Sequence, residues 1–238
     1  MWSVIVTTIQ AIDKNKHNNL KVSANPTLLQ SEGRHFAPLV VQEFVAASQD
    51  YPVVFVKDSD TGQFKAIALL GLKPGENEFY SPQGWRGNYT PEALTLYPFL
   101  ISQNKDDDSA ILCFDSASPL INETQGQALF EQEAETPWLQ EQGERVVQYV
   151  EKSQMTDQFI KMLLDFELVS PQSLSLTLED NEEYTLNGLY AIDENKLNQL
   201  DDDKFNQLRK TGALTPIYAS LISMQRIHNI VRLKLATK

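Results

Sequence analysis

Cysteine and histidine are scarce in this sequence of 238 residues. The single cysteine, Cys113, excludes an internal disulfide and fits a reducing compartment. It lies in the apolar run 110–114, which predicts a buried strand and a core thiol, because no base or positive charge is near it in the sequence. The three histidines, His17, His35 and His228, are too far apart to match zinc or iron ligand spacings. The sequence therefore predicts no metal site and no cofactor.

Nucleotide-binding and nucleophile motifs are missing as well. The ten glycines form neither a G-x-G-x-x-G fingerprint nor a Walker A loop, and the two glycines of 70–75 predict a turn. No serine lies in a G-x-S-x-G elbow. The aspartate runs 106–108 and 201–203 do not fit a calcium-binding loop and predict solvated loops or helix starts. No catalytic residue follows from motifs alone.

Positive charge is in deficit. The chain has 20 Lys plus Arg against 32 Asp plus Glu, a formal net charge of -12. A surface of this sign repels phosphate backbones and anionic lipid head groups, so nucleic acid is not an expected partner. The longest basic candidate, 204–210, predicts a solvated helix face.

Long apolar runs are also absent. No stretch approaches the roughly 18 residues that a membrane helix requires, so no integral membrane segment is expected. Residues 1–9 carry neither a basic region nor a small-residue cleavage site, and their alternation predicts a first strand instead of a signal peptide. We expect a cytoplasmic location.

The first half of the sequence predicts mainly strands. The apolar run 51–56, the polar turn 57–62 and the apolar run 64–71 together indicate a β-hairpin. A short helix is expected over 41–47, and a strand over 110–115. Thr90 followed by Pro91 resembles a helix cap, with a short helix to Leu96.

The second half predicts mainly helices. Thr136-Pro137 indicates a helix start, and a further helix is expected to begin at Thr156 or Asp157. The alternating segments 173–178 and 184–192 predict a second hairpin. Asp193 is expected to cap a helix that ends near Gly212, and Thr215-Pro216 to begin the last one.

These elements predict an α+β fold. The N-terminal half is strand-rich with antiparallel hairpins, and the C-terminal half is helical with a second hairpin. The polar breaks 13–19, 105–109 and 179–183 predict surface loops, and none is long enough to be a clear domain linker. We therefore expect a single domain over 1–238, with a subdivision at 1–120 and 121–238 as the alternative.

One irregular segment is unusual in composition. Residues 79–89 contain three aromatic side chains in addition to Phe79, together with two glycines, a proline and Arg86, and Tyr97 follows shortly downstream. Aromatic surfaces beside a guanidinium are typical of a recognition site. They are equally typical of a loop pinned onto a core. Both interpretations stay open, and the binding interpretation names Trp85, Arg86, Tyr89 and Tyr97.

At these residues the chain resembles the SapC family. The resemblance covers most of the chain in order, and its individual motifs are short. It is carried by Arg34 to Ala47, Tyr51-Pro-Val-Val-Phe55, Leu69-Leu-Gly71, Gly84-Trp85 with Tyr89 and Pro91, Tyr97-Pro-Phe99, Cys113-Phe-Asp115, Leu129-Phe130, Thr136, Leu186-Asn-Gly188, Ile192-Asp-Glu194, Leu208, Gly212-Ala-Leu214, Ser223, and His17 with Leu20.

The sequence departs from the family pattern at two places. The family often has an arginine shortly before Tyr-Pro-Phe, where Thr95 and Leu96 stand here, and a glycine where this chain has Ala134. What the resemblance implies is an accessory role in the export or modification of a peptide or protein, since the family takes its name from surface-layer export. It brings no established catalytic residues to this chain.

Three hypotheses follow. The first is a binding protein for a peptide or protein partner that uses the aromatic segment as its contact surface. The second is an enzyme on a peptide or small metabolite, with acid–base groups from His17, Glu43 and Asp115, whose polar side chains stand inside otherwise apolar motifs. The third is a peripheral subunit of a surface-layer export apparatus. The oligomeric state cannot be inferred from the sequence.

Overall fold

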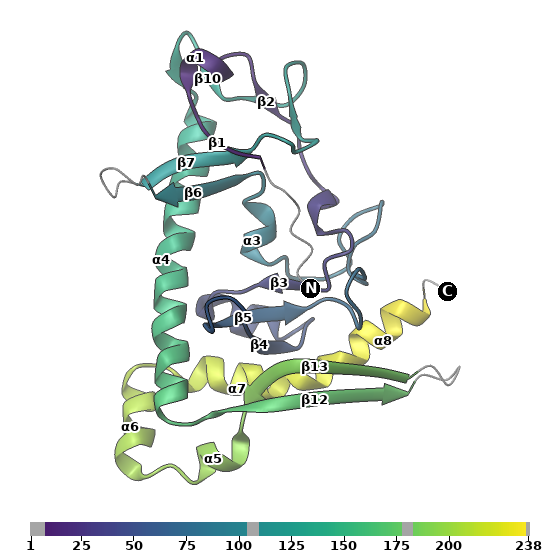
Figure 1. Cartoon of the computed structure of the whole chain (residues 1–238), viewed down its shortest axis with the longest axis vertical. Helices are drawn as coiled ribbons and strands as arrows, with labels where there is room; N and C mark the ends of the chain where they lie inside the picture. Colours follow the sequence, from purple (N-terminus) through teal and green to yellow (C-terminus); the bar gives the residue numbers. More distant parts are fainter. Residues whose placement is uncertain (1–7, 104–109, 178–182, 237–238) are drawn as a thin grey trace. The chain divides into compact units, whose positions relative to one another are not determined.

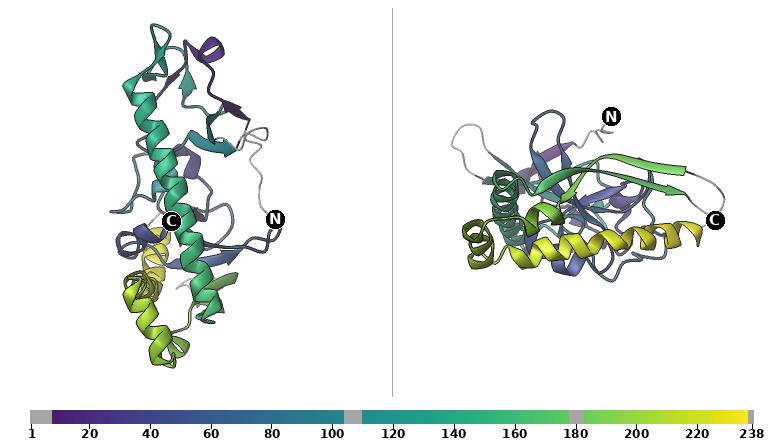
Figure 2. Two further views of the ribbon diagram at one scale, coloured as in Figure 1. Left: turned by 90° about the vertical axis from the view of Figure 1, so that its left-hand side faces the viewer. Right: turned by 90° about the horizontal axis from the view of Figure 1, so that it is seen from below.

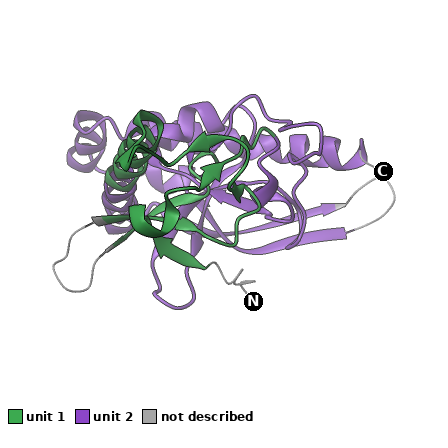
Figure 3. Cartoon of the chain, turned by 90° about the horizontal axis from the view of Figure 1, so that it is seen from above, with its two compact units in different colours: residues 1–26, 95–151 green, residues 27–94, 152–238 purple. Residues whose placement is uncertain are grey.

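The chain folds into two compact units. The computed structural model describes residues 8–103, 110–177 and 183–236. Unit 1 comprises 1–26 and 95–151, and unit 2 comprises 27–94 and 152–238 (Figure 3). Each unit therefore draws on both halves of the sequence. The single-domain organisation over 1–238 stays a prediction.

Unit 1 is built on small antiparallel sheets (Figure 1). One sheet has the order β1-β7-β6, a second the order β8-β2-β9, and a two-stranded ribbon pairs β10 with β11. The elements are β1 (Ile9–Ala11), α1 (Lys14–His17), β2 (Lys21–Val22), β6 (Phe99–Gln103), β7 (Ala110–Asp115), β8 (Ile121–Asn122), β9 (Gln127–Ala128), β10 (Phe130–Glu131) and β11 (Ala134–Glu135).

Helix α4 (Pro137–Asp165) begins in unit 1 and continues into unit 2. It starts where the sequence predicts, because the Thr136 hydroxyl accepts a hydrogen bond of 3.2 Å from the amide of Leu139 and a proline occupies the first helical position. In unit 1 the helix packs Leu139 and Val146 against a core that includes Phe99, Phe114 and Leu129.

Unit 2 contains a five-stranded antiparallel sheet of order β12-β13-β4-β5-β3. The strands are β3 (Phe36–Pro38), β4 (Val53–Lys57), β5 (Phe64–Leu69), β12 (Val169–Thr177) and β13 (Glu183–Ile192). β4 and β5 form the predicted first hairpin, and β12 and β13 the second, so both are confirmed. β13 pairs with β4 only at two positions, Leu189 with Val56 and Tyr190 with Phe55.

Helices of unit 2 pack against this sheet. Helix α7 contacts β13 and β4, and Figure 2 shows α7 and α8 running alongside the β12–β13 hairpin. The Ser220 hydroxyl donates to the carbonyl of Val53, and the Ser223 hydroxyl accepts from the amide of Val53, at 2.9 and 2.8 Å. The helices are α2 (Phe44–Ala47), α3 (Glu92–Thr95), which ends at the unit boundary, α5 (Glu194–Asn198), α6 (Asp202–Lys210), α7 (Leu214–Ser223) and α8 (Ile227–Leu235).

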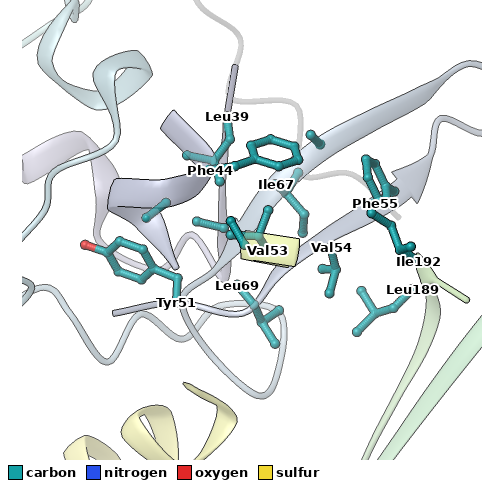
Figure 4. Packing of buried hydrophobic residues seen from close by; sticks show 14 of the residues in the cluster. Leu39, Phe44, Tyr51, Val53, Val54, Phe55, Ile67, Leu69, Leu189 and Ile192 are labelled. Atoms are coloured by element: carbon teal, nitrogen blue, oxygen red, sulfur yellow. The ribbon is translucent and has the colours of Figure 1, made fainter. Parts of the chain in front are cut away.

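The core of unit 2 lies on the sheet. Fully buried side chains from β4 and β5 meet Phe44 of α2, which packs edge-on against Phe159 of α4 at 5.8 Å. Figure 4 shows Phe44, Val53, Ile67 and Leu69 in this cluster, with the Tyr51 hydroxyl pointing away from the apolar side chains. The Tyr51 ring is fully buried, so its polar end needs a partner outside the apolar cluster.

Three helix predictions are wrong in their boundaries. Thr156 begins no helix: it lies inside α4, and its hydroxyl donates to the carbonyl of Lys152. The helix expected from Asp193 to Gly212 is two helices, because Asp201 caps a second start by accepting from the amide of Lys204. Helix α7 begins at Leu214, with Thr215 inside it.

The remaining local predictions are mixed. The expected loop 13–19 contains the one-turn helix α1. The strand 110–115 is confirmed as β7, and Cys113 is buried there, with burial raising the pKa of its thiol. Residues 105–109 lie outside the described residues, as do 179–182 and 1–7.

Candidate functional site

The aromatic segment 79–89 belongs to unit 2 and is bonded to the buried Tyr51. The Trp85 indole donates to the Tyr51 hydroxyl at 2.9 Å and to the carbonyl of Tyr89 at 3.1 Å. The Tyr51 hydroxyl in turn donates to the same Tyr89 carbonyl. The Trp85 ring stacks on Phe79 with 5.9 Å between centroids. These contacts hold the segment in one conformation on the core, and burial raises the pKa of Tyr51 far above its ordinary value.

Glu43 is the second anchor of this segment. It ends a 3₁₀ turn (Val41–Glu43), and its carboxylate folds back to accept from the amide of Val40 at 2.9 Å. The other carboxylate oxygen accepts from the Tyr89 hydroxyl and from the amide of Glu92, each at 2.7 Å. Both oxygens are therefore used inside the unit.

The pKa of Glu43 is raised above its ordinary value. The side chain is only 4% exposed, and this burial disfavours the charged form. The three hydrogen bonds act in the opposite direction, and the nearby Glu92 charge adds to the rise. A raised pKa is the direction that a general acid requires.

Asp50 was missed by the sequence reasoning. It is 5% exposed and accepts from the amide of Tyr89 at 2.7 Å and from the Asn88 side chain at 2.9 Å. The only signal in the sequence is an acidic residue directly before the apolar run of Tyr51. Because such residues are common at strand starts, the signal does not indicate a site.

Arg86 lies on the exposed side of the segment. Its backbone amide donates to the carbonyl of Phe79 at 2.9 Å, which fixes the direction of the chain. Its side chain is exposed, with one guanidinium nitrogen 3.5 Å from the carbonyl of Glu78. The segment thus presents a guanidinium beside a half-buried indole.

The other predicted residues lie in unit 1. The Tyr97 hydroxyl donates to the carboxylate of Asp115 at 3.0 Å, and the amide of Ala117 donates to its other oxygen at 3.1 Å. His17 is 7% exposed; its Nδ1 accepts from the amide of Asp13 at 3.0 Å, and its ring packs edge-on against Phe114 at 5.0 Å. His17 therefore contacts the strand neighbour of Asp115.

The structure brings some of the predicted residues together. Glu43, Trp85 and Tyr89 form one bonded cluster in unit 2, with Arg86 beside it. Tyr97 and Asp115 form a bonded pair in unit 1. The acid–base set of the enzyme hypothesis combines His17 and Asp115 from unit 1 with Glu43 from unit 2, and its convergence stays a prediction.

A pocket in unit 2 was not predicted. It has a volume of about 180 Å³ and lies between residues 185–189 of β13 and strands β3, β4 and β5, with the loop at Leu72 and Pro74. Its lining is mainly apolar, with polar groups at His35, Thr185 and Asn187. Burial lowers the pKa of His35. Sequence patterns could not indicate this pocket, because its lining comes from four separate strands and a loop.

Two further properties bear on the site. Within the described ranges, no group of three or more His, Cys, Asp or Glu side chains is arranged to hold a metal ion. Among the helices that the structure describes, none combines the length and apolar character needed to cross a bilayer.

Comparison with protein families identifies the chain. The SapC family profile matches residues 12–230, which is most of the sequence and includes the aromatic segment. The chain belongs to the SapC family. Searches among curated proteins and solved structures gave no significant match. Motifs that carry the resemblance lie at both places in this SapC chain. The bonded cluster of unit 2 includes Gly84-Trp85 and Tyr89. The Tyr97–Asp115 pair of unit 1 belongs to Tyr97-Pro-Phe99.

Proposed function

We propose that this SapC chain is an accessory protein that binds a peptide or protein during its export or modification. The observation that carries the proposal is the anchoring of the aromatic segment: Trp85 and Tyr89 are held by Tyr51, Glu43 and Asp50. A surface fixed in advance loses little conformational entropy when a partner binds. Aromatic side chains and arginine are also the residue types enriched at protein interfaces.

The chemistry of the cluster suits binding. The indole nitrogen of Trp85 and the carboxylate of Glu43 are engaged within the unit, and the segment presents ring surfaces to a partner. Beside them lies the exposed side chain of Arg86, which also contacts the carbonyl of Glu78. Family membership supports a role in export or modification. The single buried cysteine fits the cytoplasm, where we place this function.

Capture from the native host tests the proposal. Wild-type chain and an Arg86→Glu variant would be used as baits, and the captured proteins and peptides quantified by mass spectrometry. We expect at least one partner bound by the wild type to be lost with Arg86→Glu. The matched control is Arg209→Glu on α6, which makes the same charge change at an exposed position.

The Arg86→Glu and Arg209→Glu variants distinguish the possible outcomes. If Arg209→Glu and Arg86→Glu lose the same partners, the effect is general electrostatics and the aromatic segment is not the contact surface. If Arg86→Glu captures every partner at wild-type levels, the proposal is wrong. Circular dichroism of both variants shows whether the fold is kept.

A further inference from the structure

Strand β12 is an open edge of the unit 2 sheet. It is nine residues long, longer than the usual strand of about five or six. It stands last in the strand order, and among the described residues β13 is the strand that pairs with it (Figure 1). An edge strand presents a row of backbone amides and carbonyls that another extended chain can pair with.

The usual protection of an edge is incomplete on β12. Natural proteins protect edges with short strands, charged residues, prolines and bulges. The opposite edge of this sheet follows that rule: β3 has three residues and ends in Pro38. On β12, Pro171 protects the first part, and the register shift opposite Ser173 places an extra residue on β13, but 173–176 contains neither a charge nor a proline.

Side chains of β12 alternate in a way that suits a further strand. Leu174 and Leu176 are half-buried and pack against the core of unit 2, while Ser173 and Ser175 are exposed. A proline in a sheet lies on an edge with its nitrogen facing away from the neighbouring strand. The register shift between Gln172 and Leu174 places its extra residue on β13, so β12 keeps its own alternation. Backbone groups alternate in direction along a strand, and we therefore expect the amides of Ser173 and Ser175 to face outward as the Pro171 nitrogen does.

The surroundings of this edge are acidic. In the described stretches 162–177 and 183–195 the sequence has five Asp or Glu residues and no Lys or Arg. Glu167 lies two residues before β12, Glu183 pairs with the last residue of β12, and Asp193 accepts from Ser170 at 3.0 Å. Three lysines approach the hairpin from other elements. Lys204 of α6 lies over the Phe166 ring with its ammonium 3.7 Å from Asp201, and Lys73 and Lys234 lie over the ring of Tyr184, which pairs with Leu176. Lys234 is itself paired with Glu76 and Glu78, so the balance of charge at the hairpin stays acidic.

We propose that the outer edge of β12 binds an extended, basic peptide segment by adding it as a further strand. Backbone pairing gives the affinity, and apolar residues alternating with Lys or Arg would continue the Leu174–Leu176 face and meet the acidic surroundings. The inference rests on the proposed function in that the chain binds a polypeptide, but it uses a surface other than the aromatic segment. A second copy of this chain is disfavoured as occupant, because it would bring two acidic edges together.

A defined probe tests the edge. The full-length chain would be titrated into a fluorescent peptide of about ten alternating lysine and valine residues, with an alternating glutamate and valine peptide as its counterpart, and anisotropy measured. We expect binding of the basic peptide, weakening with salt, and slower hydrogen exchange at Ser173 and Ser175 when it is bound. The acidic peptide is expected to bind at least about tenfold more weakly.

Variants at Ser175 provide the decisive comparison. Ser175→Pro removes an outward amide and should weaken peptide binding by about tenfold or more. Ser175→Lys should also weaken it, and Ser175→Glu should not, so the test stands even where the proline variant fails to fold. The matched control is Gln207→Lys on α6, an exposed position that receives the same added charge.

Other results would overturn the inference. The first is that the basic peptide does not bind, and the second is that the acidic peptide binds equally well. The third is a dimer, detected by light scattering, that Ser175→Pro converts to a monomer. Peptide binding lost with Arg86→Glu but kept with Ser175→Pro would place the peptide on the aromatic segment; the edge assignment then fails while the proposed function stands. Peptide binding that is lost with Ser175→Pro and kept with Arg86→Glu supports the β12 edge as the binding site. The proposed function is then tested separately by the capture experiment.

Discussion

The phenol of Tyr89 donates a hydrogen bond of 2.7 Å to the carboxylate of Glu43, a residue 46 positions earlier in the chain. Tyr89 is also the residue whose backbone carbonyl receives the Tyr51 and Trp85 donors, and whose amide is bound by Asp50. One residue thus joins the aromatic segment to two buried acids and a buried phenol. Removing one of its hydrogen bonds therefore tests directly how firmly the segment is held.

Tyr89→Phe keeps the ring and removes the bond to Glu43. A hydrogen bond to a charged or buried acceptor is worth about 1.5–3 kcal/mol, so the free energy of unfolding should fall by about that amount. Because the bond also lowers the pKa of Glu43, that pKa should rise further. Urea unfolding measures the first effect. Tyr218→Phe, at a 42% exposed position, is the control and should change stability by less than about 0.5 kcal/mol.

Glu43 should make stability depend on pH in a defined direction. Its folded pKa is raised above the unfolded value of about 4.3, so the folded state holds the proton more tightly. Its contribution is fully present below pH about 4.3 and is lost as pH rises through the folded pKa. The free energy of unfolding of the wild type minus that of Glu43→Gln should therefore fall as pH rises. Urea unfolding of both proteins at successive pH values measures this quantity. If wild type minus Glu43→Gln instead rises with pH, the hydrogen bonds to the carboxylate outweigh its burial.

Local patterns in the sequence predicted elements whose determinants are local. The first hairpin was predicted because Asp58 and Gly62 stand between two apolar runs, and the structure closes this turn with the Asp58 carboxylate accepting from the amides of Asp60 and Thr61. Asp193 was predicted as a cap from its position before an apolar stripe, and it accepts from the amide of Lys196. Such contacts span three residues or fewer, so the sequence carries them directly.

Contacts made at long range were not predictable in this way. Thr156 has the composition of a helix cap, yet its hydroxyl accepts from the amide of Val41, 115 positions away, and α4 continues through it. The aromatic segment could be recognised as unusual from its composition. Its anchors could not, because Tyr51 and Asp50 lie 34 or more positions from the residues of the segment that they bind.

Gly87 lies inside the anchored segment and has no room for a side chain. A Cβ at this position would clash with the Tyr51 hydroxyl and lie 2.8 Å from the Trp85 indole nitrogen. Gly87→Ala should therefore separate these groups and lower stability by about 1–3 kcal/mol. Gly143→Ala on α4 is the control: its Cβ would meet only a Leu112 methyl at 3.5 Å, and alanine favours a helix over glycine by about 1 kcal/mol. Thermal unfolding followed by circular dichroism should show shifts of opposite sign.

Lys234 of α8 pairs with two acidic side chains. Its ammonium lies 2.8 Å from Glu76 and 3.2 Å from Glu78, and the lysine side chain is 11% exposed. Burial acts to lower the pKa of Lys234, but the two carboxylates outweigh it and the pKa is raised. Lys234→Met keeps the alkyl chain and leaves two partly buried carboxylates without their cation, so stability should fall by about 2–4 kcal/mol in urea unfolding. Replacing both glutamates by glutamine as well should restore part of the loss.

The control is Lys161→Met, which removes an ion pair at a 74% exposed lysine and should change stability by less than about 1 kcal/mol. Equal losses of stability in Lys234→Met and Lys161→Met would refute the buried cluster.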